Sequence, residues 1–243
     1  MFGKNKTVKV QKSENYDGTL KIREVFHTIQ GEGPFSGQRS VFLRFAGCNL
    51  KCFWCDTDFD SVSLTKTIKE TLDIFRDEPK GSLIVITGGE PLLQCGLVDV
   101  IEGLLSFGFH IQIETSGSVA TEKFLQFLEK TEGERYVTDR LHIVCSPKTP
   151  KLEERLLPFI LCYKYVLRAG EVDLDGLPNK STQVLGKSAV LYRPKEPGVP
   201  IYVSPCDEHD PVLNEQNLQV AIESVMEHGH LLSLQVHKII NMP

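Results

Sequence analysis

Short apolar runs alternate along this chain with segments of helical periodicity, and this alternation restricts the folds that the chain can adopt. Two helical patterns have clear ends: residues 91–108 start with Pro91 and stop at Gly108, and residues 211–228 lie between Asp210 and Gly229. The strand-like runs are residues 19–26, 40–47, 83–89, 109–115, 141–147, 163–170, 199–205 and 231–238.

Strands that alternate with helices predict a mainly parallel sheet with right-handed crossovers. In such sheets, ligands bind at the C-terminal ends of the strands. The 243 residues are 41% hydrophobic and 24% charged, which is ordinary for one globular domain. Residues 171–200 are rich in Gly and Pro, so we expect irregular structure with short strands at most, and assign them no ligand chemistry.

The charge and terminal sequence exclude several functions. A net charge of -5 gives no whole-protein electrostatic reason to bind nucleic acid or an anionic membrane. No apolar run approaches the ~20 residues of a membrane span. Residues 1–18 are polar and lack the apolar core of a signal peptide, so we expect a cytoplasmic protein without a disulfide framework.

Three of the seven cysteines, Cys48, Cys52 and Cys55, lie in "GCNLKCFWCDTD" (47–58) with C-x3-C-x2-C spacing. A structural zinc site would need four ligands, and a second pair is missing. A four-iron, four-sulfur cluster also takes four cysteines as a rule. With three, one iron keeps a position for a small molecule. Zinc and three unrelated buried cysteines remain the alternatives.

The ends of later strands carry small and polar residues. Gly88, Gly89 and Glu90 follow one strand, and Gly117 follows the next after "IETS". Glycines let the backbone approach a ligand closely, and a carboxylate suits an ammonium group. Strand-to-helix turns are often rich in Ser and Gly without any ligand, so each motif alone is also compatible with a simple turn.

"CNLKCFWC" resembles the C-x3-C-x-aromatic-C signature of the radical S-adenosylmethionine (SAM) superfamily, and "ITGGEPLLQ" (86–94) resembles its Gly-Gly-Glu motif. The resemblance implies a modified, partial (β/α)6 barrel. It also implies a [4Fe-4S] cluster whose open iron is ligated by SAM, which is then cleaved to a 5′-deoxyadenosyl radical. The SAM-binding positions that it implies are Trp54, Gly88, Gly89, Glu90, Gly117, Ser146, Lys148, Ser204 and Asp207. Packing for Trp54 and helix capping for residues 204–211 are the alternative roles.

A second resemblance is more specific. "FHTIQGEGPFSGQRSVFLRFAGCNLKC" (26–52), "CDT" (55–57) and the C-terminal "HKIINMP" resemble the 7-carboxy-7-deazaguanine synthase family, from about residue 20 to the last residue. The family converts 6-carboxy-5,6,7,8-tetrahydropterin to 7-carboxy-7-deazaguanine with loss of ammonia, on the route to queuosine and other 7-deazapurines. The radical takes hydrogen from C6 and later returns it, so that SAM is regenerated.

This resemblance also implies the substrate site. Thr57 would ligate Mg²⁺, and the C-terminal tail would close the site. The implied substrate-binding residues are Ile29, Gln30, Gly31, Glu32, Arg44, Thr115 and Pro243. A surface ion pair of Arg44, a turn capped by Thr57 and a frayed terminus are the alternatives.

The expected organisation is a polar extension, residues 1–18, and one core domain, residues 19–243. Residues 129–140 and 171–200 are longer than in a minimal member of the family. The resemblance further implies a homodimer and an external flavodoxin- or ferredoxin-like electron donor. A glycyl-radical-enzyme activase is the alternative enzyme, and a non-enzymatic zinc or iron–sulfur module is the alternative outside enzymes.

Overall fold

The computed structural model describes residues 16–55, 57, 63–184 and 186–243, and within these ranges nine strands form one sheet. The strand order across the sheet is β3-β1-β2-β4-β5-β6-β7-β8-β9. The strands are β1 Thr19–Ile29, β2 Arg39–Phe45, β3 Leu64–Thr67, β4 Leu83–Gly88, β5 His110–Thr115, β6 Leu141–Cys145, β7 Ile160–Leu167, β8 Ile201–Pro205 and β9 Leu231–Leu232.

The long strands β2, β4, β5, β6, β7 and β8 are parallel and follow one another across the sheet. β1 is antiparallel to β2 and to β3 at one edge. The edge strands β3 and β9 do not pair with each other in the described part of the chain, so hydrogen bonds leave the barrel open. The predicted mainly parallel, partial (β/α)6 barrel is therefore confirmed.

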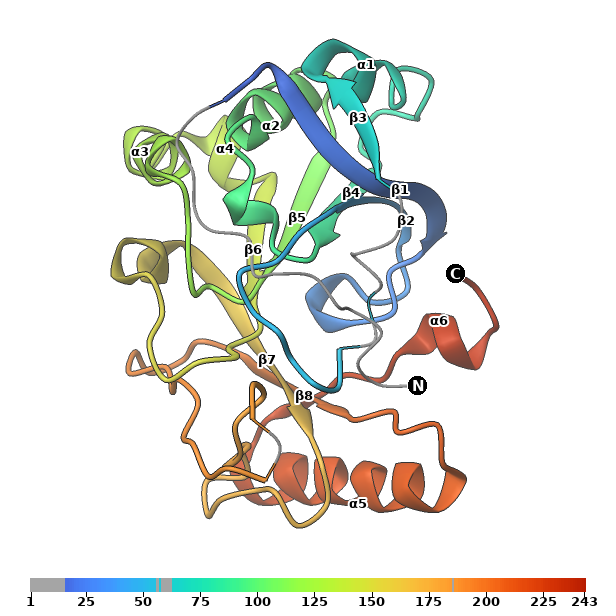
Figure 1. Ribbon diagram of the computed structural model, residues 1–243, viewed down its shortest axis with the longest axis vertical. Helices are drawn as coiled ribbons and strands as arrows, with labels where there is room; N and C mark the ends of the chain where they lie inside the picture. Colours follow the sequence, from blue (N-terminus) through green and yellow to red (C-terminus); the bar gives the residue numbers. More distant parts are fainter. Residues whose placement is uncertain (1–15, 56, 58–62, 185) are drawn as a thin grey trace.

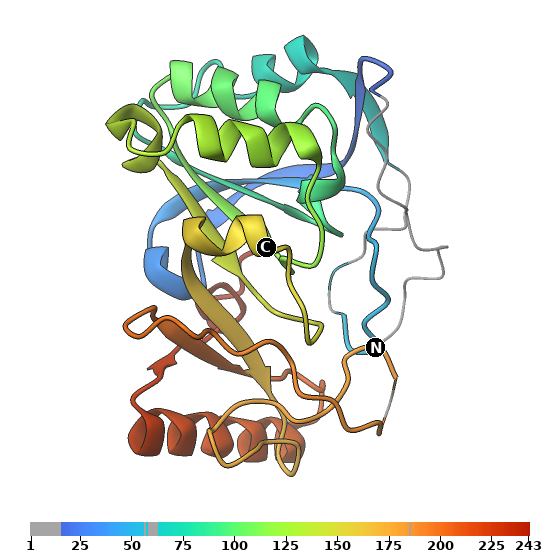
Figure 2. The ribbon, with the colours of Figure 1, turned by 90° about the vertical axis from the view of Figure 1, so that its left-hand side faces the viewer.

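The helices cover the outside of the curved sheet. α1, α2 and α3 lie together over its first half, and α5 lies along β8 at the opposite end (Figures 1 and 2). The helices are α1 Ile68–Asp73, α2 Leu97–Ser106, α3 Glu122–Lys130, α4 Arg135–Thr138, α5 Pro211–His228 and α6 Val236–Ile239, with 3-10 turns η1 Gly33–Phe35, η2 Pro91–Leu93 and η3 Glu154–Phe159.

The helix predicted from Pro91 to Gly108 begins later than expected. Pro91 opens only the short turn η2, Gln94 is extended, and α2 begins at Leu97. Two contacts break the helical path: Glu90 accepts a hydrogen bond from Leu92 N, and the Gln94 side chain donates to Ala46 O. The predicted end is confirmed, because Gly108 has a φ of 86° directly after the helix.

α5 has the predicted ends, and its buried face combines the polar Asn217 and Ser224 with Ala221. Asp210 caps it by accepting hydrogen bonds from Val212 N and Leu213 N. Asn217 is buried between Cys206 O and the amide of Ala169. These hydrogen bonds attach the helix to the segments that follow β7 and β8, and they add satisfied polar contacts to the packing of Ala221 against the core.

Residues 231–238 were expected to form a strand, and this prediction is wrong beyond Leu232. β9 contains only two residues, and α6 begins at Val236. The amide of Val236 donates to Gly31 O, which carries the chain away from the sheet edge and towards β1. Residues 171–200 are irregular, as expected, with two isolated bridges.

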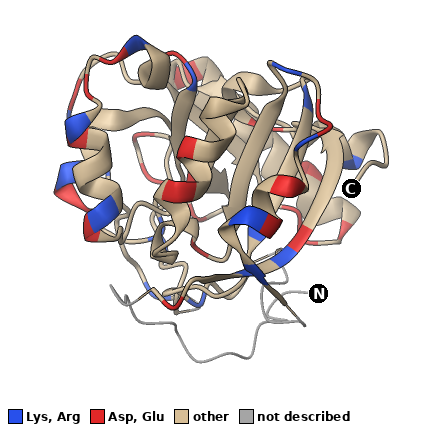
Figure 3. Ribbon diagram, turned by 90° about the horizontal axis from the view of Figure 1, so that it is seen from above, with Lys and Arg blue, Asp and Glu red and all other residues tan. Residues whose placement is uncertain are grey.

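The surface of the described residues carries mixed charges. Lys and Arg alternate with Asp and Glu along the outer helices (Figure 3). No helix of the described residues has the length and apolar character needed to cross a membrane. Residues 1–15 of the predicted extension lie outside the described residues, and the extension stays a prediction.

Candidate active site

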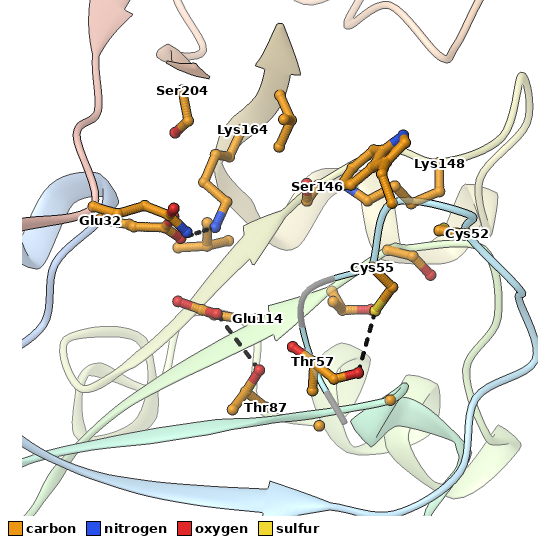
Figure 4. A pocket seen from close by; sticks show the side chains of 18 of the residues that line it. Glu32, Cys52, Cys55, Thr57, Thr87, Glu114, Ser146, Lys148, Lys164 and Ser204 are labelled. Atoms are coloured by element: carbon orange, nitrogen blue, oxygen red, sulfur yellow. Dashed lines mark hydrogen bonds and ion pairs between the residues drawn. The ribbon is translucent and has the colours of Figure 1, made fainter. Parts of the chain in front are cut away.

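One cavity of about 250 Å³ lies at the C-terminal edge of the parallel sheet. Each of the six parallel strands contributes a side chain at or near its C-terminal end. These side chains are Arg44, Thr87, Glu114, Val144, Lys164 and Ser204. This is the edge where the fold predicts ligand binding. Figure 4 shows the cavity with Glu32, Lys164 and Ser204 on one side and Cys52, Cys55, Ser146 and Lys148 on the other.

The three predicted cluster cysteines, Cys48, Cys52 and Cys55, all line this cavity. Their loop leaves β2 and is attached to the Gly-Gly-Glu segment, because Glu90 N donates to Gly47 O over 2.9 Å. A Cβ atom on Gly89 would lie 2.0 Å from Gly47 O. Only glycine permits this approach, so the two sequence motifs are joined into one site.

The chemistry of the cysteines fits an iron–sulfur cluster. Burial raises the pKa of the Cys48 thiol to about 12, and the neighbouring charges of Glu90, Cys52 and Cys55 act in the same direction. Iron would therefore displace a proton from Cys48 on binding. Within the described ranges, no three His, Cys, Asp or Glu side chains surround a single ion. A cluster does not require this, because each cysteine holds a different iron.

Glu90 lies directly behind the cavity wall and is fully buried. Its carboxylate accepts hydrogen bonds from the hydroxyls of Thr115 and Ser116 and from the amides of Ser116 and Leu92. Burial raises the pKa of Glu90, and these hydrogen bonds oppose the rise. Thr115 and Ser116 themselves line the cavity. The Glu90 carboxylate therefore holds two lining side chains in position.

Trp54, Ser146 and Lys148 form the wall beside the cysteines. Lys148 Nζ lies 5.0 Å from the centre of the Trp54 ring and donates to Ser146 Oγ. Burial lowers the pKa of Lys148, while the charges of Cys52 and Cys55 raise it. The Lys148 ammonium and the Trp54 ring therefore form a cation–π pair on this wall of the cavity.

Ser204 supplies a polar atom that the protein does not satisfy. It is 2% exposed, lines the cavity, and its Oγ has no hydrogen-bond partner among the described residues. Buried hydroxyls are normally hydrogen-bonded, so this one fits a ligand. Asp207 also lines the cavity but binds Lys238 and Asn214. Gly117 lies outside the lining and has a φ of 69° next to Cys145.

An ion pair between Glu32 and Lys164 occupies the side of the cavity opposite the cysteines (Figure 4). Their side chains are only 12% and 11% exposed. Burial alone would raise the pKa of the Glu32 carboxyl. The Lys164 ammonium and a hydrogen bond from Gln235 act in the opposite direction, and the net pKa is lowered, so the carboxyl stays ionised. This pair presents both charges to a ligand in the cavity.

A second polar group lies between β1 and β5. Gln30 Nε2 donates to Glu114 Oε1 over 3.2 Å, and Thr87 Oγ1 donates to the other oxygen of Glu114 over 3.5 Å. All three side chains line the cavity. Together with Glu32 they bring two carboxylates, an amide and a hydroxyl to this part of the cavity.

Arg44 faces two partners. Its Nε donates to Glu24 over 2.8 Å, which is the ion pair considered as the alternative role, and its Nη1 donates to Thr57 Oγ1 over 3.2 Å inside the cavity. The guanidinium also lies over the Phe26 ring. Arg44 and Thr57 are thus brought together at the end of β2, close to the cysteine loop.

Three of the predicted substrate residues, Ile29, Gly31 and Pro243, lie outside the cavity lining. Gly31 supports α6, because a Cβ atom there would lie 2.0 Å from His237 Nδ1. The Pro243 carbonyl oxygen accepts a hydrogen bond from Thr28 Oγ1 over 2.7 Å. The C-terminal tail therefore runs beside β1, with Gln235 and His237 as its contribution to the cavity.

Sequence reasoning missed several lining or contacting residues. Lys164 and Val166 lie inside a run read only as a strand, although their alternation on β7 could have placed both on one face. Gln235 and His237 fell in a predicted strand. Gln183 and Thr182, in a segment with no assigned chemistry, reach the cysteine loop.

Three cysteines with C-x3-C-x2-C spacing, at the C-terminal edge of an open parallel barrel, fit the radical SAM class. The family model of the Radical SAM superfamily accordingly matches residues 43–143. The crystal structure of QueE from Escherichia coli has a TM-score of 0.60 at 21% identity, covering 89% of this chain and 94% of that chain, and thus shares its fold.

Two curated relatives define the family. A 7-carboxy-7-deazaguanine synthase of Rhodospirillum rubrum is 43% identical over 251 aligned residues, which cover 100% of both chains. One of Rickettsia prowazekii is 34% identical and covers 100% of this chain and 96% of its own. The chain belongs to the 7-carboxy-7-deazaguanine synthase family. Membership confirms the resemblance and implies a [4Fe-4S] cluster and SAM as cofactors.

Proposed function

We propose that this chain converts 6-carboxy-5,6,7,8-tetrahydropterin to 7-carboxy-7-deazaguanine and ammonia, on the route to queuosine and other 7-deazapurines. The two-sided cavity carries this proposal. Cysteines line one side, and the pair of Glu32 and Lys164 lines the other (Figure 4). The full-length identity of 43% to a synthase of that name supports the same reaction.

The cysteine side of the cavity would hold the cofactors. Cys48, Cys52 and Cys55 would bind three irons, and SAM would bind the fourth. When bound, SAM supplies a radical that takes hydrogen from C6 of the pterin. Ser204 Oγ, buried without a partner among the described residues, is available to a SAM hydroxyl. Lys148 beside Trp54 offers a cation and a ring.

The opposite side would orient the substrate. Glu32 and Glu114 would accept hydrogen bonds from the ring N–H and amino groups of the pterin, and Gln30 would provide both a donor and an acceptor. The guanidinium of Arg44 would bind the substrate carboxylate by a charge-assisted pair.

Mg²⁺ is proposed as a further cofactor at Thr57. The Thr57 hydroxyl lies 3.2 Å from Arg44 Nη1, so a metal there would share the carboxylate that Arg44 binds. One protein oxygen together with substrate oxygens and water is a usual set of ligands for Mg²⁺.

The remaining parts of the proposal concern partners. We propose a cytoplasmic homodimer that receives electrons from a flavodoxin- or ferredoxin-like donor, and that binds neither nucleic acid nor membrane. The net charge of -5 supports the last point.

The test is an anaerobic reaction. The protein with a reconstituted cluster is incubated with reductant, SAM, Mg²⁺ and 6-carboxytetrahydropterin, and the products are followed by mass spectrometry. We expect 7-carboxy-7-deazaguanine, with many turnovers per SAM, and none from Cys52→Ala. Slow cleavage of SAM without this product would keep the radical SAM class, refute the substrate and favour an activase.

A further inference from the structure

A turn formed by residues 181–184 contacts the cysteine loop from outside the cavity. It belongs to the irregular segment between β7 and β8, which passes beside the loop (Figure 2). Two backbone contacts hold the loop in place: Phe53 N donates to Thr182 O over 3.1 Å, and Lys51 N donates to Gln183 Oε1 over 2.8 Å. These contacts flank Cys52 on both sides.

The same turn reaches the Cys52 sulfur. Gln183 Nε2 lies 3.0 Å from Cys52 Sγ and 2.8 Å from Thr182 Oγ1. The orientation of the amide is fixed, because its oxygen is the group that accepts from Lys51 N. The amide nitrogen must therefore face the sulfur, and it can only donate.

Thr182 strengthens this arrangement. It is 3% exposed, and its hydroxyl donates to Lys148 O over 3.0 Å. The hydroxyl oxygen is then available to accept one of the two Gln183 amide protons, while the other points at Cys52. A chain of hydrogen bonds thus runs from Cys52 through Gln183 and Thr182 to the backbone beside β6.

We propose that Gln183 is a positioning residue whose side-chain amide donates a hydrogen bond to the Cys52 thiolate and raises the reduction potential of the iron–sulfur cluster. Reduction adds one electron and therefore negative charge. A hydrogen bond donated to a ligating sulfur stabilises the reduced form more than the oxidised form. Gln183 thereby eases the electron transfer that must precede cleavage of SAM.

The proposal rests on the cluster of the proposed function, and its test is a redox titration rather than an activity. Wild type, Gln183→Met and Gln183→Glu are reconstituted and analysed for iron and sulfide, and are then titrated without SAM while the reduced cluster is followed by electron paramagnetic resonance. Gln183→Met removes donor and acceptor at similar volume. Gln183→Glu keeps the acceptor for Lys51 N, but replaces the donor by an acceptor and adds a negative charge beside the Cys52 sulfur. Gln219→Met, on exposed α5, is the matched control.

We expect all four proteins to hold a full cluster. Gln183→Met should be reduced about tenfold less favourably than wild type, which is about 59 mV lower for one electron. Gln183→Glu should be lowered by more than Gln183→Met, because its carboxylate charge also disfavours the added electron. The Gln219→Met control should match wild type.

An unchanged potential in either Gln183 variant would overturn the proposal, and so would loss of the cluster from both variants, because the turn would then serve assembly alone. Absence of a cluster from wild type would instead refute the proposed function.

Discussion

At the scale of single residues, Glu32 and Lys164 form a largely buried pair of opposite charges in the cavity. Burial alone would raise the pKa of the Glu32 carboxyl, but the Lys164 ammonium, a hydrogen bond from Gln235 and the charge of His237 together lower it below its ordinary value. A carboxyl whose folded-state pKa is lowered stabilises the fold at pH values above its ordinary value of 4.5, and this contribution is lost as the pH falls through the folded-state pKa.

We therefore expect the free energy of unfolding to depend less on pH in Glu32→Gln than in wild type at acidic pH. The free energy of unfolding of wild type should decrease more steeply than that of the variant between about pH 5 and pH 3. Urea denaturation at several pH values measures this difference. Glu132→Gln, which removes an exposed carboxylate, should follow wild type. Parallel curves for wild type and Glu32→Gln would show that the pair does not stabilise the fold.

Arg44 carries a prediction about substrate affinity. Arg44→Ala should weaken binding of the carboxypterin about 10- to 150-fold, because a charge-assisted pair contributes about 1.5–3 kcal/mol. Arg44→Lys should recover only part of the lost affinity, since the lysine ammonium lacks the planar, two-donor geometry of the guanidinium. Calorimetry with the cluster-loaded protein gives the affinities. Arg39→Ala, on the exposed start of β2, is the control, and equal affinities for Arg44→Ala and wild type would exclude the carboxylate contact.

At the scale of elements, the site depends on the contact between the cysteine loop and the end of β4. Gly89→Ala would place a methyl group 2.0 Å from Gly47 O and 2.9 Å from Cys48 Cβ. We expect a cost of about 1–3 kcal/mol and a clear loss of bound iron per chain, because the loop must shift. Gly96→Ala, whose new methyl would meet only side-chain ends at 3.0 Å, should retain its iron. Full iron content in Gly89→Ala would contradict this coupling.

The elements show what the sequence could and could not predict. Strand runs and the ends of α5 were predictable, because apolar periodicity, Asp210 and Gly229 are local signals. The late start of α2 was not, because Gln94 is drawn away from helical geometry by Ala46 O, 48 residues earlier. α6 was missed for the same reason: its first amide binds Gly31 O.

The residues of the candidate site also differ in whether a local sequence motif could predict them. The cysteines, Gly88 and Gly89 form contiguous motifs, and the resemblance to known families supplied their roles. Lys164 and Gln183 carry no motif, since their partners lie 132 and 131 residues away in the sequence. Only the folded sheet brings such residues together.

At the scale of the whole molecule, the C-terminal tail lies against the end of β1, where Thr28 Oγ1 donates to the Pro243 oxygen. Deletion of residues 236–243 should leave the sheet folded, because α6 and the tail bury little side-chain surface, but should open the cavity on the side of Glu32. We expect a raised KM for the carboxypterin with SAM affinity nearly unchanged. Ile239→Ala, an exposed position of α6, should resemble wild type, and a deletion variant with unchanged KM would remove the tail from the substrate site.

The central claim is that cluster, SAM and pterin share one cavity at the C-terminal edge of the sheet. Its most direct test uses 6-carboxytetrahydropterin with deuterium at C6, incubated with the reduced, cluster-loaded protein and unlabelled SAM. The account predicts that deuterium appears in recovered SAM during turnover, because hydrogen passes from C6 to the cofactor and back. Formation of 7-carboxy-7-deazaguanine while SAM stays unlabelled would contradict it.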